Sequence, residues 1–178
     1  HLFADDANLF YVNKSLKDLE NQINKELENV QNWLCANKLT FNIDRSNLII
    51  FHPPQKKLTR TANLFINKQI LKSKDSSKYL GIILDQHLNW KAHVAHVAKK
   101  VKRNIGIISK VRHYTNEVLI NLYYSLIYPF LTYGLLAWGN TYHSNILPIS
   151  ILQKKALRIM SFSGFKDHPN SLFIKNIN

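Results

Sequence analysis

A long uncharged stretch constrains the fold of this 178-residue chain more than any other feature. From Val118 to Gln153 the chain contains no Lys, Arg, Asp or Glu. Residues 118–138 are long enough to cross a membrane as a helix, but Asn121, Pro129 and several tyrosines make them too polar for a typical span. We therefore expect buried helices of a bundle, broken or kinked at Pro129. A membrane-associated protein built on residues 118–138 is the alternative.

Amphipathic patterns on both sides of this stretch predict further helices. Apolar residues recur at spacings of three and four between residues 16 and 34, where Ser15 is a suitable N-cap and Asn37 a suitable left-handed C-cap. A similar stripe begins after Asn89, and its other face is basic. The helices predicted in this way begin at Leu16, Asn89, Glu117 and Asn145, and they end near Asn37, Arg112, Tyr128 and Phe162, with Gly164 as the last cap.

The region between the first two helices has the pattern of β structure. A strand at residues 48–51 is stopped by two prolines, and residues 64–66 and 69–71 form a hairpin around Asn67-Lys68. Residues 79–84 predict a further strand, in which Gly81 marks a bulge or the close approach of another backbone. The fold class predicted by these patterns is α+β.

The charge distribution indicates a polyanionic partner. The formal net charge is +13, and residues 53–112 carry fourteen Lys and Arg against only Asp75 and Asp85. On the basic helix, a solvated face and a phosphate-binding face are both consistent with a run that lacks acids. His93 and His96 lie three residues apart there, and without a third ligand we interpret them as surface residues. The candidate phosphate contacts on this helix are Lys99, Lys100, Lys102 and Arg103.

The single cysteine and the single methionine indicate the context of the chain. Cys35 alone excludes an intrachain disulfide or a cysteine-cluster zinc site, and it is typical of a reducing compartment, here the cytoplasm or nucleus. We expect its side chain to be buried as a small apolar group. Because Met160 is the only methionine, we interpret the sequence as part of a longer or processed product.

Two adjacent carboxylates, Asp5 and Asp6, lie between two short apolar runs. This pattern predicts a hairpin with the aspartates at its tip. Neighbouring carboxylates repel each other, which favours a bound divalent cation such as Mg²⁺ and suggests half of a site for phosphoryl chemistry. The alternative is that both aspartates are ordinary turn residues.

Four blocks of the sequence, taken in order, resemble the reverse transcriptases of non-LTR retrotransposons. Phe3-Ala4-Asp5-Asp6 resembles the aromatic-x-Asp-Asp box of these polymerases, and residues 32–42, followed by the strand at residues 46–51, resemble the segment after it. Residues 78–85 with Leu88-Asn89-Trp90 are similar to the strand pair that grips the primer end. Residues 128–139 and 152–158 resemble the helical region that follows. The most similar elements are those of the insect jockey group.

The resemblance implies a partial polymerase palm at residues 1–85, an all-helical thumb-like region at residues 86–165 and a frayed tail at residues 166–178. Asp5 and Asp6 would be catalytic residues and ligands of Mg²⁺ in a two-metal nucleotidyl transfer to the primer 3′-hydroxyl. Tyr79, Leu80 and Gly81 would form the primer grip. Arg45 stands where the family usually carries a lysine that is a proposed proton donor, so we expect it to bind phosphate instead.

The earlier motifs of the family do not occur in this sequence. They comprise the upstream palm aspartate, the fingers and the dNTP-binding segment, and Asp44, Asp75 and Asp85 appear only as isolated surface or turn acids. We therefore expect the chain to be inactive alone. Its expected partners are an RNA template and a DNA primer, with dNTP bound only alongside an upstream half, no membrane and no oligomer. The alternative function is a non-catalytic, basic nucleic-acid-binding remnant or co-opted module.

Overall fold

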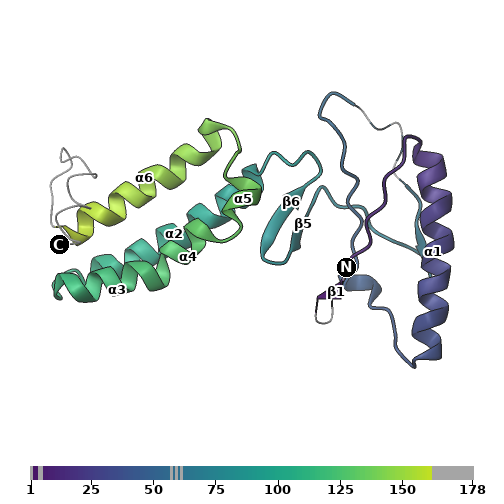
Figure 1. The fold of residues 1–178 in the computed structure, drawn as a ribbon, viewed down its shortest axis with the longest axis horizontal. Coiled ribbons are helices and arrows are strands. Elements are labelled where there is room, and N and C mark those ends of the chain that lie inside the picture. The colour runs from purple at the N-terminus through teal and green to yellow at the C-terminus, as the bar shows by residue number, and fades with distance from the viewer. Residues whose placement is uncertain (1, 4–5, 57, 59, 61, 162–178) are drawn as a thin grey trace. The chain divides into compact units, whose positions relative to one another are not determined.

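The structure is a computed structural model that describes residues 2–3, 6–56, 58, 60 and 62–161. It has mixed α+β structure, as the sequence predicts, and its elements are labelled in Figure 1. The chain divides into two units, residues 1–77 (unit 1) and residues 78–178 (unit 2). The predicted palm segment, residues 1–85, therefore includes unit 1 and the first strands of unit 2.

Unit 1 is built on helix α1, Leu16–Ala36. The Ser15 hydroxyl accepts a hydrogen bond from the Asp18 N–H at 3.4 Å, which confirms the predicted N-cap. At the other end, Asn37 has a φ of −92°, and Lys38 rather than Asn37 is left-handed, with a φ of 56°. The Asn37 amide instead donates to the Trp33 carbonyl. The buried core residues of this unit are Ile23, Leu27, Ala62, Leu64, Ile66 and Leu71.

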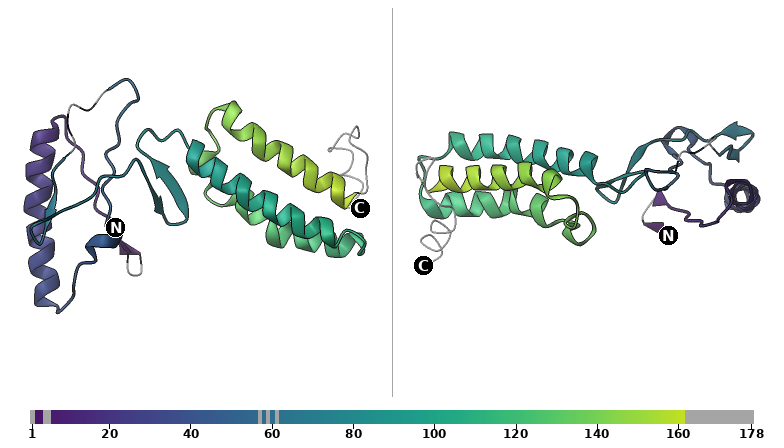
Figure 2. Two further views of the ribbon diagram at one scale, coloured as in Figure 1. Left: turned by 180° about the vertical axis from the view of Figure 1, so that it is seen from behind. Right: turned by 90° about the horizontal axis from the view of Figure 1, so that it is seen from above.

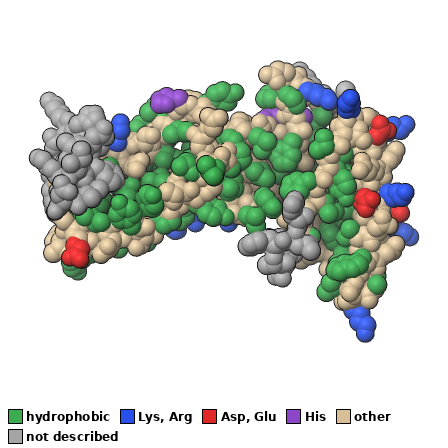
Figure 3. All heavy atoms as spheres, viewed as in Figure 1, with side chains coloured by type: hydrophobic (Ala, Val, Ile, Leu, Met, Phe, Trp, Pro, Cys, Tyr) green, Lys and Arg blue, Asp and Glu red, His purple; other side chains and the backbone are tan. Residues whose placement is uncertain are grey.

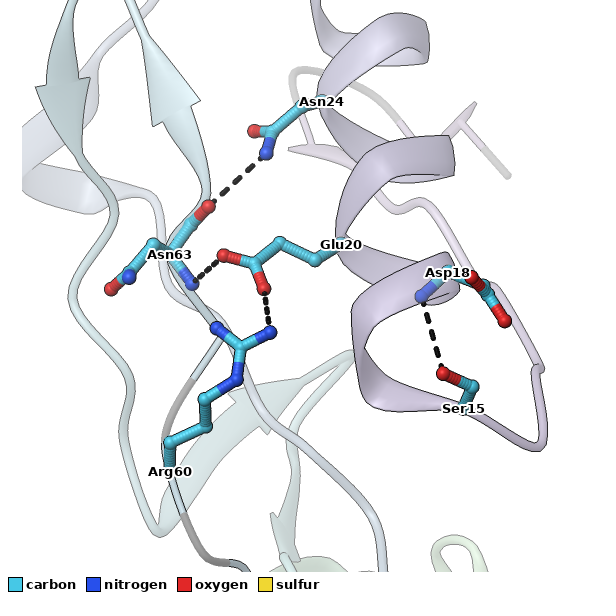
Figure 4. Close-up of polar contacts among 6 residues, drawn as sticks. All are labelled: Ser15, Asp18, Glu20, Asn24, Arg60 and Asn63. Atoms are coloured by element: carbon cyan, nitrogen blue, oxygen red, sulfur yellow. Dashed lines mark hydrogen bonds and ion pairs between the residues drawn. The ribbon is translucent and has the colours of Figure 1, made fainter.

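The polar face of α1 binds the backbone of an extended segment. Glu20 accepts a hydrogen bond from the Asn63 N–H at 2.9 Å and forms an ion pair with Arg60 at 2.6 Å, as Figure 4 shows. Asn24 donates to the Asn63 carbonyl and accepts from the Phe65 N–H. Because one amide satisfies both a donor and an acceptor of the extended chain, it replaces part of a missing strand ladder.

The short strands of unit 1 form two antiparallel hairpins. β1, Leu2–Phe3, pairs with β2, Asp6–Ala7, and β3, Phe65–Ile66, pairs with β4, Gln69–Ile70. The connection between β3 and β4 is Asn67-Lys68, as predicted, and both residues have a positive φ, which is typical of two-residue hairpin turns. The strand predicted at residues 48–51 is wrong, because only an isolated bridge from Leu48 to Ser73 forms.

The next two strands form a hairpin where the sequence pattern predicted one continuous strand. β5, Ser76–Tyr79, and β6, Ile82–Asp85, are neighbours in a two-stranded sheet. Leu80-Gly81 connects them, with φ values of 45° and 85°. The sequence pattern does not predict this turn, because Leu80 is apolar and two-residue turns usually consist of polar residues or glycine.

The helices of unit 2 pack around one hydrophobic core. α2, Lys91–Lys110, packs against α6, His143–Met160, and against α3, Asn116–Leu126, and Figure 2 shows these helices side by side. Two short helices, α4, Tyr128–Thr132, and α5, Leu135–Trp138, link α3 to α6. The predicted cap Gly164 and the predicted tail at residues 166–178 lie outside the described residues. The core is formed mainly by Val94, Val97, Val101, Ile105, Ile108, Leu119, Tyr123, Ile127, Trp138, Ile149 and Ala156.

The uncharged stretch spans most of α3, all of α4 and α5 and the first part of α6, and α3 ends just before Pro129. Proline has no N–H, and the Phe130 N–H bonds the Ile127 carbonyl, so the chain leaves the α3 ladder. The buried Asn104 side chain donates a hydrogen bond to the Leu126 carbonyl at this break. Across the described part of the chain, every helix is too short or too polar to span a bilayer.

The loop between β6 and α2 is organised by a buried carboxylate. Asp85 is only 8% exposed, and its oxygens accept hydrogen bonds from the backbone N–H groups of His87, Asn89 and Trp90 at 2.9–3.1 Å. These bonds hold Trp90 in a left-handed conformation with a φ of 64°, directly before the first turn of α2. Asp85 is thus a turn acid, as predicted, but it is not on the surface.

Replacement of Glu20 by Gln should lower the thermal stability of the chain in a pH-dependent way. The ion pair with Arg60, and then the Asn63 hydrogen bond, lower the pKa of Glu20 below its usual value. A lowered folded-state pKa contributes stability above the unfolded pKa of about 4.3, and this stability is lost as the pH falls through the folded value. The Tm difference between Glu20→Gln and wild type should therefore shrink below pH ~4, whereas a pH-independent difference would contradict the ion pair.

Replacement of Asp85 by Asn should destabilise unit 2 by about 1–3 kcal/mol, because an amide presents a donor to N–H groups that need an acceptor. Chemical denaturation, followed by the fluorescence of the three tryptophans, of which Trp90 and Trp138 lie in unit 2, measures this change. The matched control is Asp75→Asn, which alters an exposed carboxylate. Equal stabilities of the two variants would show that Asp85 does not organise the loop.

Candidate functional site

The Asp-Asp hairpin lies at the start of unit 1. Leu2 pairs with Ala7 and Phe3 with Asp6, so residues 4 and 5 connect the two strands. Asp6 therefore lies on β2 opposite Phe3, whereas Asp5 lies outside the described residues. A hairpin forms here, as predicted from the apolar flanks, but Asp6 lies on its second strand and not at its tip.

A complete metal site does not occur among the residues that the structure describes. In that part of the chain, no three His, Cys, Asp or Glu side chains gather closely enough to hold an ion. The buried carboxylate of Asp85 accepts hydrogen bonds from its own loop. The donor set for Mg²⁺ is thus incomplete within the described residues.

The Leu80-Gly81 turn, which belongs to the predicted primer grip, is exposed. A tyrosine of the helical region, Tyr133, forms a hydrogen bond with it. The Tyr133 hydroxyl donates a hydrogen bond to the Leu80 carbonyl at 2.6 Å. A Cβ atom on Gly81 would lie 3.2 Å from the Tyr133 ring, so only glycine allows this close approach without adjustment. Two of the sequence blocks, at residues 78–85 and 128–139, therefore meet at this turn.

His93 of α2 also contacts the hairpin, at the backbone of β6. Its side chain is 2% exposed, and its Nδ1 accepts a hydrogen bond from the Ile83 N–H at 3.2 Å. Burial, and then the charge of His96, lower the pKa of His93, which keeps the imidazole neutral and able to accept. The interpretation of His93 as a surface residue is wrong, because it occupies the α2 stripe next to Val94 and faces the core.

The basic face of α2 is formed by Lys99, Lys102 and Arg103, which are all exposed and share one side of the helix. Lys100 is half-buried beside them. Within the described ranges, none of these four residues pairs with a carboxylate; the ion pair found there joins Glu20 and Arg60. Four uncompensated cations on one helix create a positive potential that attracts phosphates.

Lys78 extends this positive potential to the β5–β6 hairpin. Burial, and then the charges of Lys100, Lys78 and Lys99, lower the pKa of His96. Lys78 belongs to β5 and precedes the Leu80-Gly81 turn by one residue, so the turn and α2 contribute to the same electrostatic environment. Lys78 was not selected from the sequence, although it lies within a matched block.

The remaining predicted residues lie in different surroundings. Arg45 is exposed in unit 1 at the end of a 3₁₀ turn, Ile43–Arg45, where the Asn42 side chain caps its N–H. Tyr79 is half-buried at the end of β5. Cys35 is exposed on α1, so the expectation of a buried thiol is wrong.

The surface of unit 2 also carries exposed hydrophobic side chains, and its face in Figure 3 is mostly hydrophobic or uncharged. Tyr133 is among them and is 57% exposed, despite its hydrogen bond to the turn. Sequence reasoning placed Tyr133 in a matched block but assigned it no role. The signal was the Tyr-Gly pair, because Gly134 has a φ of 64° and forms a sharp turn.

Comparison with curated proteins identifies relatives among the polymerases of mobile elements. The chain is 26% identical over 163 residues to the RNA-directed DNA polymerase from mobile element jockey of Drosophila melanogaster, and 21% identical to that of Drosophila funebris. It is 23% identical to a probable RNA-directed DNA polymerase from transposon X-element of Drosophila melanogaster. No protein-family model and no solved structure matches the chain.

These matches extend over most of the chain but over little of each relative. The aligned region covers 89% of this chain and 18% of each of the three polymerases. The predicted resemblance to the jockey group is confirmed at this level, and the chain is a distant homologue of a segment of the RNA-directed DNA polymerases encoded by jockey and X-element transposons.

Proposed function

We propose that this chain is the late palm and thumb-like segment of an RNA-directed DNA polymerase and that it holds the primer–template duplex. Residues 1–85 form the palm part in this proposal, and residues 86–165 form the thumb-like part. The RNA template and DNA primer are the nucleic-acid partners, in the cytoplasm or nucleus. The distant homology to mobile-element polymerases supports this class of function.

One observation carries the proposal: the exposed turn and the uncompensated basic face belong to the same unit. A polymerase must contact both the phosphate backbone of the duplex and the end of the primer. Lys99, Lys102 and Arg103 are suited to the backbone, because contacts to phosphate need charge but no base recognition. The turn at Leu80-Gly81 is suited to the primer end, because Gly81 has no side chain to block a close approach.

Asp5 and Asp6 have a narrower role in the proposal. They would contribute ligands to a Mg²⁺ site that requires further ligands, and Arg45 would bind phosphate. Nucleotidyl transfer and the binding of dNTP therefore belong to a longer polymerase. The chain alone would bind duplex without extending it.

A non-catalytic nucleic-acid-binding module is the second candidate function. It is favoured by the contrast between the developed basic face of α2 and the incomplete metal ligand set in the described part of the chain. Both candidates require duplex binding, and they differ in whether Asp5 contributes to synthesis.

Neutralising the basic face should weaken binding to an RNA–DNA duplex and reduce its salt dependence. We expect the triple variant Lys99→Gln, Lys102→Gln, Arg103→Gln to lower the slope of log K against log salt by roughly 2–3, because each phosphate contact releases about one counterion. Fluorescence anisotropy at several salt concentrations measures this slope.

The control for this experiment removes three charges elsewhere. Lys14, Lys17 and Lys25 are exposed residues of unit 1, and their replacement by Gln changes the net charge equally. A wild-type affinity that does not depend on salt, or an equal loss in both triple variants, would contradict the proposed interface.

Primer extension tests the expectation that the chain alone is inactive. The purified chain, given Mg²⁺, dNTPs and a primed RNA template, should bind the template but add no nucleotides, because the upstream palm aspartate of the polymerase family does not occur in this sequence. A complete reverse transcriptase under the same conditions is the positive control. Synthesis by the chain that is abolished by Asp5→Asn would overturn the expectation of inactivity.

A further inference from the structure

We propose that Tyr133 is a positioning residue that fixes the backbone of the Leu80-Gly81 turn and thereby sets its contact with the primer end. The inference rests on the proposed function, because it assigns to this turn the recognition of a recessed 3′ end. Tyr133 itself would act through the turn.

The Leu80-Gly81 turn adopts a conformation that its sequence does not favour. Leu80 has a φ of 45°, in the left-handed region where a branched side chain meets its own backbone. Two-residue hairpin turns with two positive φ values normally place Asn, Asp or Gly first. The surroundings must therefore stabilise Leu80 in this conformation.

Tyr133 supplies this stabilisation at both residues of the turn. Its hydroxyl donates a hydrogen bond to the Leu80 carbonyl at 2.6 Å, and its ring lies so close to Gly81 that a Cβ atom there would be 3.2 Å from it. The hydrogen bond fixes the orientation of the peptide between the two residues, and the ring limits the movement of Gly81. A phenylalanine at position 133 would keep the ring contact and lose only the hydrogen bond.

The backbone of Tyr133 is itself held in place by hydrogen bonds to its neighbours. Its carbonyl accepts a hydrogen bond from the buried Trp138 indole at 2.9 Å, and its N–H bonds the Pro129 carbonyl at 2.9 Å. The next residue, Gly134, packs on β6 so closely that a Cβ atom there would lie 2.5 Å from Ile82. The backbone that carries Tyr133 therefore has little freedom to move.

The indole of Trp138 is also connected to the hairpin through His93. Trp138 lies edge-on to His93 with ring centroids 5.5 Å apart, and His93 accepts the Ile83 N–H. The turn, Tyr133, Trp138, His93 and Ile83 thus form a closed circuit of contacts. The circuit fixes the exposed turn relative to α2, which carries both His93 and the basic face.

If Tyr133 has this role, the affinity for duplex and the preference for a primer end should depend on different residues. Charges on α2 determine the affinity for any duplex, whereas the shape of the turn determines the preference for a primer end. Loss of the Tyr133 hydroxyl should therefore lower the end preference without changing the affinity for a duplex that has no end available. A purely structural role would instead lower stability and both affinities together.

The experiment compares Tyr133→Phe with wild type in the 178-residue chain. Anisotropy measures the Kd for an RNA–DNA duplex with a recessed primer 3′ end and for the same duplex closed by a loop at that end. We expect wild type to prefer the recessed end and Tyr133→Phe to lose this preference by at least three-fold, with the Kd for the closed duplex unchanged. Tyr124→Phe is the matched control, because Tyr124 is an exposed tyrosine of α3 in the same unit.

A spectroscopic readout tests the geometry separately. The three-bond N–H to Hα coupling of Leu80 and the amide shift of Gly81 should change in Tyr133→Phe and remain unchanged in Tyr124→Phe. Retained end preference or unchanged turn signals in Tyr133→Phe would overturn the positioning role. Absence of any duplex binding by wild type would instead refute the proposed function, while altered turn signals would still support the hydrogen bond.

Discussion

Unit 2 depends on the burial of one face of α2. Val94, Val97, Val101, Ile105 and Ile108 point into the core against α3 and α6, and each buried side chain of this size contributes about 1.5–3 kcal/mol. This burial leaves the lysines and Arg103 no position except the surface. The hydrophobic pattern of one helix therefore both builds the unit and presents its charge.

The other elements of unit 2 are attached to α2 through polar contacts of the backbone. Asp85 fixes the loop that leads into the helix, and the Asn89 carbonyl at the end of this loop accepts hydrogen bonds from Thr141 and Asn145. His93 and Trp138 connect the helix to β6 and to the Tyr133 turn. The matched sequence blocks at residues 78–90 and 128–139 are thus parts of one contact network, which gives a physical reason for their joint presence.

The predictions from sequence succeeded where local periodicity decided the structure. The stripe from Leu16 to Leu34, the Ser15 cap and the Asn67-Lys68 hairpin all depend on neighbouring residues. The predictions failed where contacts between residues far apart in the sequence determine the structure. The turn at Leu80 is stabilised by Tyr133, and His93 packs against Trp138. The contacts of Glu20 on α1 also depend on distant residues, because it binds Arg60 and Asn63. Asp5 and Asp6 were selected by a local pattern, but a metal site depends on ligands from distant segments.

The central claim is that one surface of unit 2 contacts both the backbone and the primer end of a duplex. Amide chemical-shift mapping of the chain with an RNA–DNA duplex that has a recessed primer tests this claim most directly. If this surface binds the duplex, the largest changes occur at residues 78–81 and along the exposed face of α2 from Lys99 to Arg103. Changes confined to unit 1, or scattered over unit 2 without these two segments, would contradict it.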